Sequence, residues 1–275
     1  SAPWAGRSRS RAATAPAGAT RGLRVAMLYG CVQHALFRHV NADTAQVLVA
    51  NGCEVVAAPG QRCCGALHAH GGDLETARSL ARRNVDAFER AGAEVIVVNA
   101  AGCGAVMKEY GHLLEDDADY AARAGELAAR VRDLFEFLAA HGARPGAPLA
   151  LRAAYDAPCH LYHGQAIRSE PVDVLRAVPG LEVDWLAHAE ECCGGAGVYG
   201  LTHPDLGGRI LDDKVADAQE SAAAVVITGN PGCIMQIGAG LLLARSPLTV
   251  AHPVELLAES YRRQVESAAT RAAPS

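Results

Sequence analysis

The sequence predicts an α/β fold built from two similar units, each with a parallel sheet. Short apolar or β-branched runs alternate with longer stretches of helical periodicity, a pattern typical of parallel strands joined by helices. The cysteines also recur at matched positions in the two halves of the chain. The 275 residues fit one large domain or two of about 130 residues, and the repeat favours two.

The first two dozen residues differ in composition from the rest. Residues 1–24 contain five Arg and no acidic residue, and the first acidic residue is Asp43. We expect a disordered linker over residues 1–22. A transit peptide is the alternative, although the segment lacks an amphipathic apolar face, and the absence of an initiator Met indicates a fragment or a processed chain.

The elements follow in order from the apolar pattern. Strands are expected at residues 23–28, 54–57, 94–99, 149–155, 182–186 and 224–228, and helices at, for example, 74–91 and 119–140. Gly52, Gly92 and Gly142 stand where helices should end. We place the first unit at residues 23–145 and the second at 146–270.

Composition excludes several classes of protein. Half of the residues are hydrophobic and 20% are charged, as in a folded globular protein. The net charge of −5 provides no positive field for phosphate backbones, so nucleic acid is not expected as a partner. No apolar run approaches the ~18 residues of a membrane-spanning helix. We therefore expect a cytoplasmic protein with at most peripheral attachment to the inner face of the membrane.

An internal repeat of cysteines is the most informative feature. Eight of the nine cysteines form two sets with the same order: Cys31, Cys63, Cys64 and Cys103 in the first half, and Cys159, Cys192, Cys193 and Cys233 in the second. Matching members are 128, 129, 129 and 130 residues apart. Each set has a Cys-Cys-Gly triplet in its middle. The repeat predicts two pseudo-symmetric, Rossmann-like units related by internal duplication.

The positions of the cysteines indicate metal chemistry. Most of them follow a predicted strand or open the next helix, where open parallel sheets place their ligands. A helix N-terminus favours the thiolate, and nearby glycines allow close backbone approach. Four cysteines in each half are the ligand count of a [4Fe–4S] cluster or of a structural zinc site. A disulfide framework is disfavoured, because adjacent cysteines rarely bond to one another.

The pattern Cys-x31-Cys-Cys-Gly-x37-Cys and its repeat resemble the duplicated cysteine-rich "CCG" domain. That domain is shared by the B subunit of heterodisulfide reductase, the iron–sulfur subunit of glycolate oxidase, and related lactate-utilisation proteins. The stretches at residues 30–33, 99–104 and 229–233 look most like the glycolate oxidase subunit. The resemblance covers residues 23–265 and implies that the eight repeated cysteines bind one or two iron–sulfur clusters.

Two departures from these families limit the resemblance. The heterodisulfide reductase subunit ends each motif in Cys-x-x-Cys, whereas Ala100 and Asn230 stand at the first of these positions here. The glycolate oxidase subunit begins with a ferredoxin module, and no Cys-x2-Cys-x2-Cys-x3-Cys-Pro run occurs in this chain. Either another polypeptide supplies the ferredoxin-like module or the chain is truncated.

Other candidate residues have simpler interpretations. Residues 195–200 match G-x-G-x-x-G but follow a loop, which disfavours dinucleotide binding. Cys53 has no counterpart in the repeat and is expected in the core. Loop residues near the cysteines are expected to be solvated or structural, with proton donors, spare ligands or partner contacts as alternatives: His68, His70, His160, His163, Glu190 and Glu191.

The resemblance implies an iron–sulfur electron-transfer subunit of a 2-hydroxy-acid (glycolate) oxidase complex. Such a subunit passes electrons from a flavin-containing dehydrogenase subunit to a quinone or another carrier. The chain itself is expected to be the non-flavin part of an oxidoreductase, with no catalytic residue assigned. The alternatives are a zinc-stabilised structural or assembly subunit and a heterodisulfide-reductase-like thiol/disulfide protein.

Overall fold

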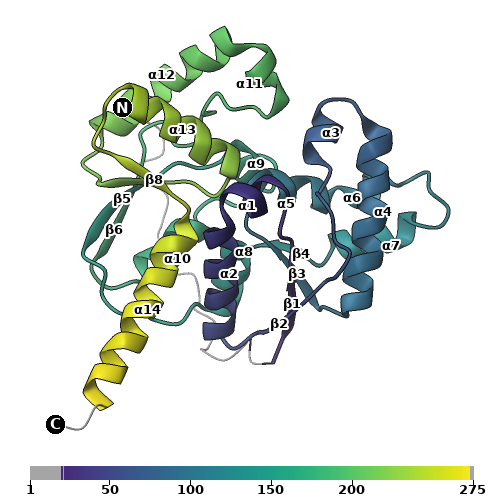
Figure 1. Ribbon diagram of the computed structural model, residues 1–275, viewed down its shortest axis with the longest axis horizontal. Coiled ribbons are helices and arrows are strands. Elements are labelled where there is room, and N and C mark those ends of the chain that lie inside the picture. The colour runs from purple at the N-terminus through teal and green to yellow at the C-terminus, as the bar shows by residue number, and fades with distance from the viewer. Residues whose placement is uncertain (1–19, 21, 273–275) are drawn as a thin grey trace, which may run out of the picture.

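A computed structural model describes residue 20 and residues 22–272, and it contains two four-stranded sheets (Figure 1). The first has the order β2-β1-β3-β4 and consists of β1 (Arg24–Met27), β2 (Glu54–Val56), β3 (Val95–Val98) and β4 (Val131–Asp133). The second has the order β6-β5-β7-β8 and consists of β5 (Leu151–Tyr155), β6 (Leu181–Trp185), β7 (Val225–Ile227) and β8 (Thr249–Ala251). Every pairing is parallel, so the predicted fold class is confirmed.

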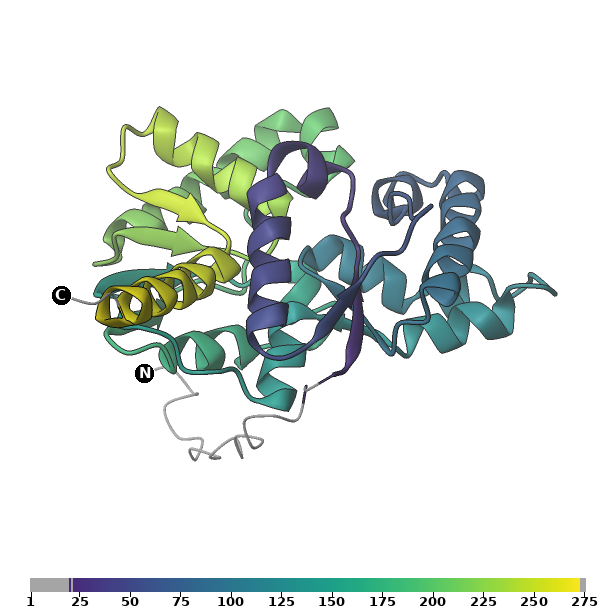
Figure 2. The same cartoon turned by 60° about the horizontal axis from the view of Figure 1, so that its bottom comes forward.

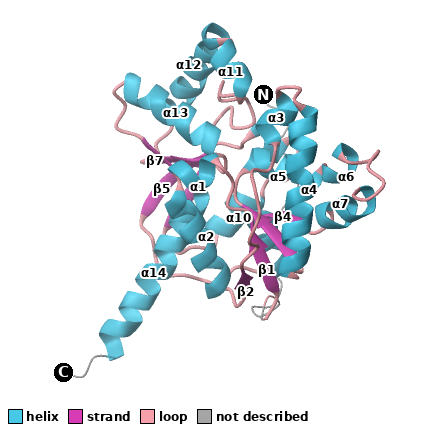
Figure 3. Cartoon of the chain, turned by 45° about the vertical axis from the view of Figure 1, so that its right-hand side comes forward, coloured by secondary structure: helices cyan, strands magenta, loops and turns pink. Residues whose placement is uncertain are grey.

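Helices connect the parallel strands, since each crossover must return the chain to the same edge of the sheet. The first half contains α1 (Val32–Leu36), α2 (Arg38–Ala50), α3 (Ala66–His70), α4 (Leu74–Ala91), α5 (Ala101–Lys108), α6 (Tyr110–Leu113), α7 (Ala121–Ala128) and α8 (Leu134–His141). The second contains α9 (Cys159–Tyr162), α10 (Glu170–Arg176), α11 (Val198–Thr202), α12 (Pro204–Glu220), α13 (Pro231–Leu243) and α14 (Pro253–Ala272). Figure 3 shows the two groups of strands with helices around them.

One predicted helix is wrong. Residues 119–140 form α7, the short strand β4 and α8, because Val131 pairs with Ile96 of β3 and extends the sheet. Asp133 then begins α8 as its N-cap, and Glu136 completes a capping box. The strand β8 was not predicted either. The six predicted strands match β1, β2, β3, β5, β6 and β7 within a few residues at each end.

Helix α14 crosses from the second half to the first. It packs against α2, while α8 of the first half packs against α10 of the second (Figure 2). One apolar core therefore includes Val40, Phe137, Leu175 and Leu257, which come from both halves. The division into units 23–145 and 146–270 remains a proposal. The predicted linker lies, apart from Thr20 and Gly22, outside the described residues.

The helices of the described residues are those of a packed α/β core. None of them combines the length and the apolar character that crossing a bilayer requires.

Candidate metal centres

The first set of cysteines comes together at the carboxyl ends of β1, β2 and β3. Cys31 follows β1, the vicinal pair Cys63 and Cys64 lies in the loop after β2, and Cys103 lies in the first turn of α5. The sulfurs of Cys31 and Cys63 are 3.4 Å apart, and those of Cys64 and Cys103 are 3.0 Å apart. The vicinal residues join the two contacting pairs, so all four thiols form one group.

The second set repeats this arrangement in the other sheet. Cys159 begins α9, Cys192 and Cys193 follow β6, and Cys233 lies in the first turn of α13. Cys159 lies close enough to Cys192, and Cys193 close enough to Cys192 and Cys233, for these neighbours to raise the pKa of each thiol. The structure therefore brings together the four members of each predicted set.

Cys53, the ninth cysteine, lies apart from both groups. It is 7% exposed and packs in the apolar core beside Val47 and Leu48. Burial raises the pKa of its thiol to about 11. This location agrees with the interpretation of Cys53 as a core residue.

The contacts between thiols shift their pKa values. The hydrogen bond with Cys63, followed by burial, raises the pKa of Cys31. In the second set the hydrogen bond with Cys192 raises the pKa of Cys159, whereas bonds from Cys159 and Cys193 lower the pKa of Cys192 to about 2. A metal centre binds cysteines as thiolates, so its binding releases the protons of these thiols.

The donor set fits a multi-sulfur cluster. Backbone N–H groups point at sulfur in both halves: the amide of Ala66 donates to Cys64 at 3.5 Å, and the amide of Gly194 donates to Cys192 at 3.3 Å. A Cβ at Gly195 would stand 3.5 Å from the sulfur of Cys193, so the backbone of this residue passes close to the thiol. Four thiols with peptide donors and bare glycines suit iron–sulfur chemistry.

A site for a single metal ion is not preformed. Among the residues that the structure describes, no group of three or more His, Cys, Asp or Glu side chains is arranged to hold a metal ion as it stands. The thiols instead lie in contacting pairs. Four thiolates are also the donor set of a closed zinc site, so zinc is retained as the alternative.

Buried side chains hydrogen-bond to the backbone at or shortly before each vicinal pair. The sequence did not reveal them. In the first half, Asn84 donates to the carbonyl of Cys63 at 3.1 Å, and the Tyr110 hydroxyl donates to the carbonyl of Cys64 at 2.7 Å. In the second half, Lys214 donates to the carbonyl of His188, just before the pair, at 2.6 Å. A helical Asn or Lys has no sequence signal that distinguishes such a role from a surface position.

Two of the predicted loop histidines meet across the junction of the two halves. His70 of the first half and His160 of the second stack with ring centroids 5.1 Å apart. Nδ1 of His160 is 3.6 Å from the sulfur of Cys159. Burial, followed by the neighbouring His70, lowers the pKa of His160, so this imidazole is held neutral beside the second group.

The other predicted loop residues have structural partners. His68 pairs with Asp73, the N-cap of α4, at 3.2 Å. The ring of His163 donates to the carbonyl of Glu190 at 3.1 Å, and Glu191 forms an exposed ion pair with a nearby histidine. These contacts favour the structural interpretation of His68, His163 and Glu191.

The two halves meet where α5, which contains Cys103, lies beside α9, which contains Cys159 (Figure 1). The amide of Ala101 donates to the carbonyl of Gly229 at 3.0 Å, and that of Gly102 donates to Oδ1 of Asn230 at 3.3 Å. Gln165 adds a bond to the carbonyl of Ala101 at 2.9 Å. The carboxyl edges of the two sheets are thus joined next to Cys103 and Cys233.

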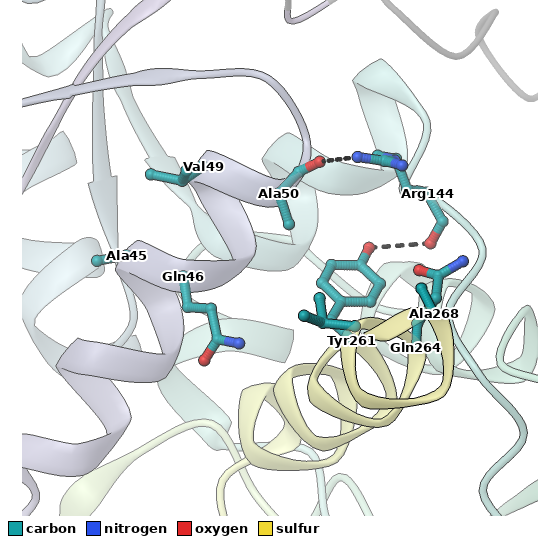
Figure 4. Close-up of a pocket in the computed structure, with 9 residues that line it drawn as sticks. Ala45, Gln46, Val49, Ala50, Arg144, Tyr261, Gln264 and Ala268 are labelled. Atoms are coloured by element: carbon teal, nitrogen blue, oxygen red, sulfur yellow. Dashed lines mark hydrogen bonds between the residues drawn. The ribbon is translucent and has the colours of Figure 1, made fainter. Parts of the chain in front are cut away.

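A groove of about 540 Å³ lies elsewhere, between α2 and α14 (Figure 4). Tyr261 and Arg144 close one side, where the hydroxyl donates to the Arg144 carbonyl at 2.9 Å and the guanidinium donates to Ala50 at 2.8 Å. No cysteine lines this groove. It has none of the chemistry of the thiol groups.

Comparison with known proteins gives the same pattern of two units. The profile of the cysteine-rich (CCG) domain family matches residues 25–108 and 153–238. A probable glycolate oxidase iron–sulfur subunit from Bacillus subtilis is 34% identical over 221 residues, which cover 79% of this chain and 50% of the relative. The glycolate oxidase iron–sulfur subunit of Escherichia coli is 36% identical over 248 residues, covering 88% and 59%. This chain thus spans about half the length of these relatives.

A third relative has a similar length to this chain. Lactate utilization protein A from an Exiguobacterium species is 32% identical over 241 residues, covering 87% of this chain and 98% of the relative. Among solved structures, glutamate racemase from Bacillus anthracis aligns over 92% of this chain and 83% of its own, with 9% identity and a TM-score of 0.35. That score is too low to support a functional argument.

Proposed function

The chain belongs to the cysteine-rich (CCG) domain family, and we propose that it is an iron–sulfur electron-transfer subunit of a 2-hydroxy-acid oxidase, with glycolate as the substrate of the complex. The observation that supports this function most directly is the convergence of four thiols in each half. The same cysteine-rich domain occurs in relatives named as iron–sulfur subunits of glycolate oxidase. Electrons would enter from a flavin and leave to a quinone or another carrier.

The residues of the chain provide the binding and tuning in this proposal. Two sets hold one cluster each: Cys31, Cys63, Cys64 and Cys103, and Cys159, Cys192, Cys193 and Cys233. An iron–sulfur cluster bound there supplies one-electron transfer. The backbone amides of Ala66 and Gly194 donate to sulfur and stabilise its negative charge. The buried networks behind the vicinal pairs fix the loops, so that the thiols keep their positions when protons leave.

A flavin-containing partner subunit follows from chemistry. Oxidation of an alcohol by hydride transfer needs a flavin or a nicotinamide, because amino-acid side chains lack this redox chemistry. Gly195 to Gly200, the phosphate-loop candidate of the sequence, leads into the five-residue helix α11 and does not follow a strand. We propose flavin-containing dehydrogenase subunits and a ferredoxin-like module as partners, at the cytoplasmic face of the membrane.

Anaerobic purification of the chain tests this function. We expect a brown protein with iron and sulfide, little zinc, substoichiometric flavin, and glycolate-dependent dye reduction only after the flavin subunits are added. Stoichiometric zinc without sulfide would establish the structural alternative. Bound flavin with steady turnover by the isolated chain would contradict the relay.

A further inference from the structure

We propose that Asn230 is the residue that connects the two cysteine groups electronically and makes the second group the more easily reduced of the two. This inference rests on the proposed function, because it concerns iron–sulfur clusters held by these thiols. Asn230 is the N-cap residue of α13, three residues before Cys233. Its side chain does not bond to its own helix backbone, as an N-cap commonly would.

The amide of Asn230 instead spans the junction. Its Oδ1 accepts a hydrogen bond from the amide of Gly102 at 3.3 Å, and its Nδ2 donates to the sulfur of Cys233 at 3.4 Å. Gly102 is covalently bonded to Cys103, a member of the first group. One side chain therefore links a cysteine of each group through two hydrogen bonds and a few covalent bonds.

The junction is held in this position by other contacts. The carbonyl of Gly229 accepts from Ala101 at 3.0 Å, and Gln165 bonds to the carbonyl of Ala101 at 2.9 Å. These contacts hold the backbone beside Cys103 against the backbone beside Cys233.

The bridge is asymmetric, because the matching residue of the first half is Ala100. The side chain of Ala100 has no donor, so Cys103 receives no hydrogen bond equivalent to the one that Cys233 receives. Hydrogen bonds to sulfur are one of the factors that set the reduction potential of a cluster, since they stabilise the more negative, reduced form. The second group is thus expected to have the higher potential.

The asymmetry gives the relay a direction. With a cluster held by each group, the thiols of the first group would hold the cluster of lower potential and those of the second the cluster of higher potential. A one-electron donor such as a reduced flavin would then be oxidised at the first group, and a one-electron acceptor such as a quinone would be reduced at the second. The bridge itself undergoes no net change, and Asn230 acts as a positioning residue.

Potentiometric titration of the anaerobically purified holoprotein, followed by electron paramagnetic resonance, tests the proposal. Cys31→Ser removes the first group and identifies the midpoint potential of the second. Asn230→Ala removes both hydrogen bonds, and Asn230→Asp keeps the shape and the acceptor but loses the donor. We expect both variants to lower the midpoint potential of the second group, and Asn230→Ala to weaken the magnetic interaction between the groups as well. A tenfold change in the one-electron equilibrium constant corresponds to about 59 mV.

Asn51→Ala is the matched control. Asn51 also joins distant parts of the chain, since its Oδ1 accepts from the amide of Arg144 at 2.8 Å and its Nδ2 donates to Tyr261 at 3.2 Å. It follows α2, however, and so lies at the edge of the sheet where β2 begins. We expect Asn51→Ala to leave both potentials unchanged. An equal shift in Asn51→Ala, or an unchanged potential in iron-loaded Asn230→Asp, would overturn the inference alone. A wild-type chain without iron and sulfide would overturn it together with the proposed function.

Discussion

Lys214 and Asp156 form an ion pair of 3.0 Å that is closed off from solvent behind the second cysteine group, with side chains that are 1% and 2% exposed. Thr228 donates to the second carboxylate oxygen at 2.9 Å. Burial raises the pKa of Asp156, while Lys214 and Thr228 oppose that shift. The first half has no such pair: Leu28 follows β1 as Asp156 follows β5, and Val85 matches Lys214 at the offset of the repeat.

We expect Lys214→Met to lower the free energy of unfolding by about 3–5 kcal/mol, because it leaves a buried carboxylate without its cation. Denaturant unfolding of the holoprotein measures this loss. The double variant Asp156→Leu/Lys214→Val copies the apolar pair of the first half and should recover most of the stability. A double variant as unstable as Lys214→Met would contradict the view that the unpaired charge causes the loss.

Cys193→Ser should remove the second metal centre. Cys193 contacts both Cys192 and Cys233, so its loss separates the two contacting pairs of that group. We expect iron and acid-labile sulfide to fall to about half of the wild-type content, with the first group still loaded. Full metal content in this variant would contradict the grouping of the second four cysteines.

Cys53→Ala serves as the control for cysteine loss. Its side chain packs in the core and lies outside both groups, so iron and sulfide should remain at the wild-type content. Removal of one buried sulfur should cost about 1 kcal/mol in the free energy of unfolding. Loss of iron in Cys53→Ala would show that the repeat does not define the ligand sets.

Repetition in the sequence predicted the thiol groups, and local pattern predicted most strands. The runs around Val97 and Val226 are apolar and β-branched, so they could only be buried strands. The strand that begins at Val131 was not predicted, because β4 has only three residues and lies between helices whose apolar residues follow the same spacing. Lys214 follows two aspartates and looks like a solvated helix face, and only the packed structure shows its carboxylate partner.

The roles of single polar residues at the junction could be recognised only in the three-dimensional structure. Asn230 interrupts the Cys-x-x-Cys pattern of the heterodisulfide reductase subunit that the sequence resembles, and the sequence showed this as a departure and not as a contact. Its partner Gly102 lies 128 residues away. The relative placement of the two sheets brings these residues together. It depends on the packing of α14 and α8 across the halves, and no local sequence pattern encodes that packing.

A buried histidine makes the stability of the fold depend on pH. His252 lies between β8 and α14 and is 1% exposed. Its Nε2 donates to the carbonyl of Asn99 in the first half at 2.9 Å, and its Nδ1 accepts from the amide of Val254 at 3.1 Å. Both ring nitrogens are used by the neutral form, and protonation of Nδ1 would break the second bond. Burial lowers the pKa of His252 from 6.5 to about 4, with a smaller effect from His39.

The sign of the effect follows from that depressed pKa. In the unfolded chain His252 takes up a proton below pH 6.5, whereas in the folded chain it stays neutral until about pH 4, so stability is lost as the pH falls through this window. The loss between pH 7.5 and pH 5 should be about 2 kcal/mol. Burial raises the pKa of Asp133 to about 7, so its contribution to stability changes with pH in the opposite direction. The contribution of His252 must therefore be measured as a difference between wild type and a variant. His252→Asn keeps an acceptor for Val254 and does not titrate. We expect its stability difference from wild type, measured by denaturant unfolding at both pH values, to shrink at pH 5, and a constant difference would show that His252 is not the group responsible.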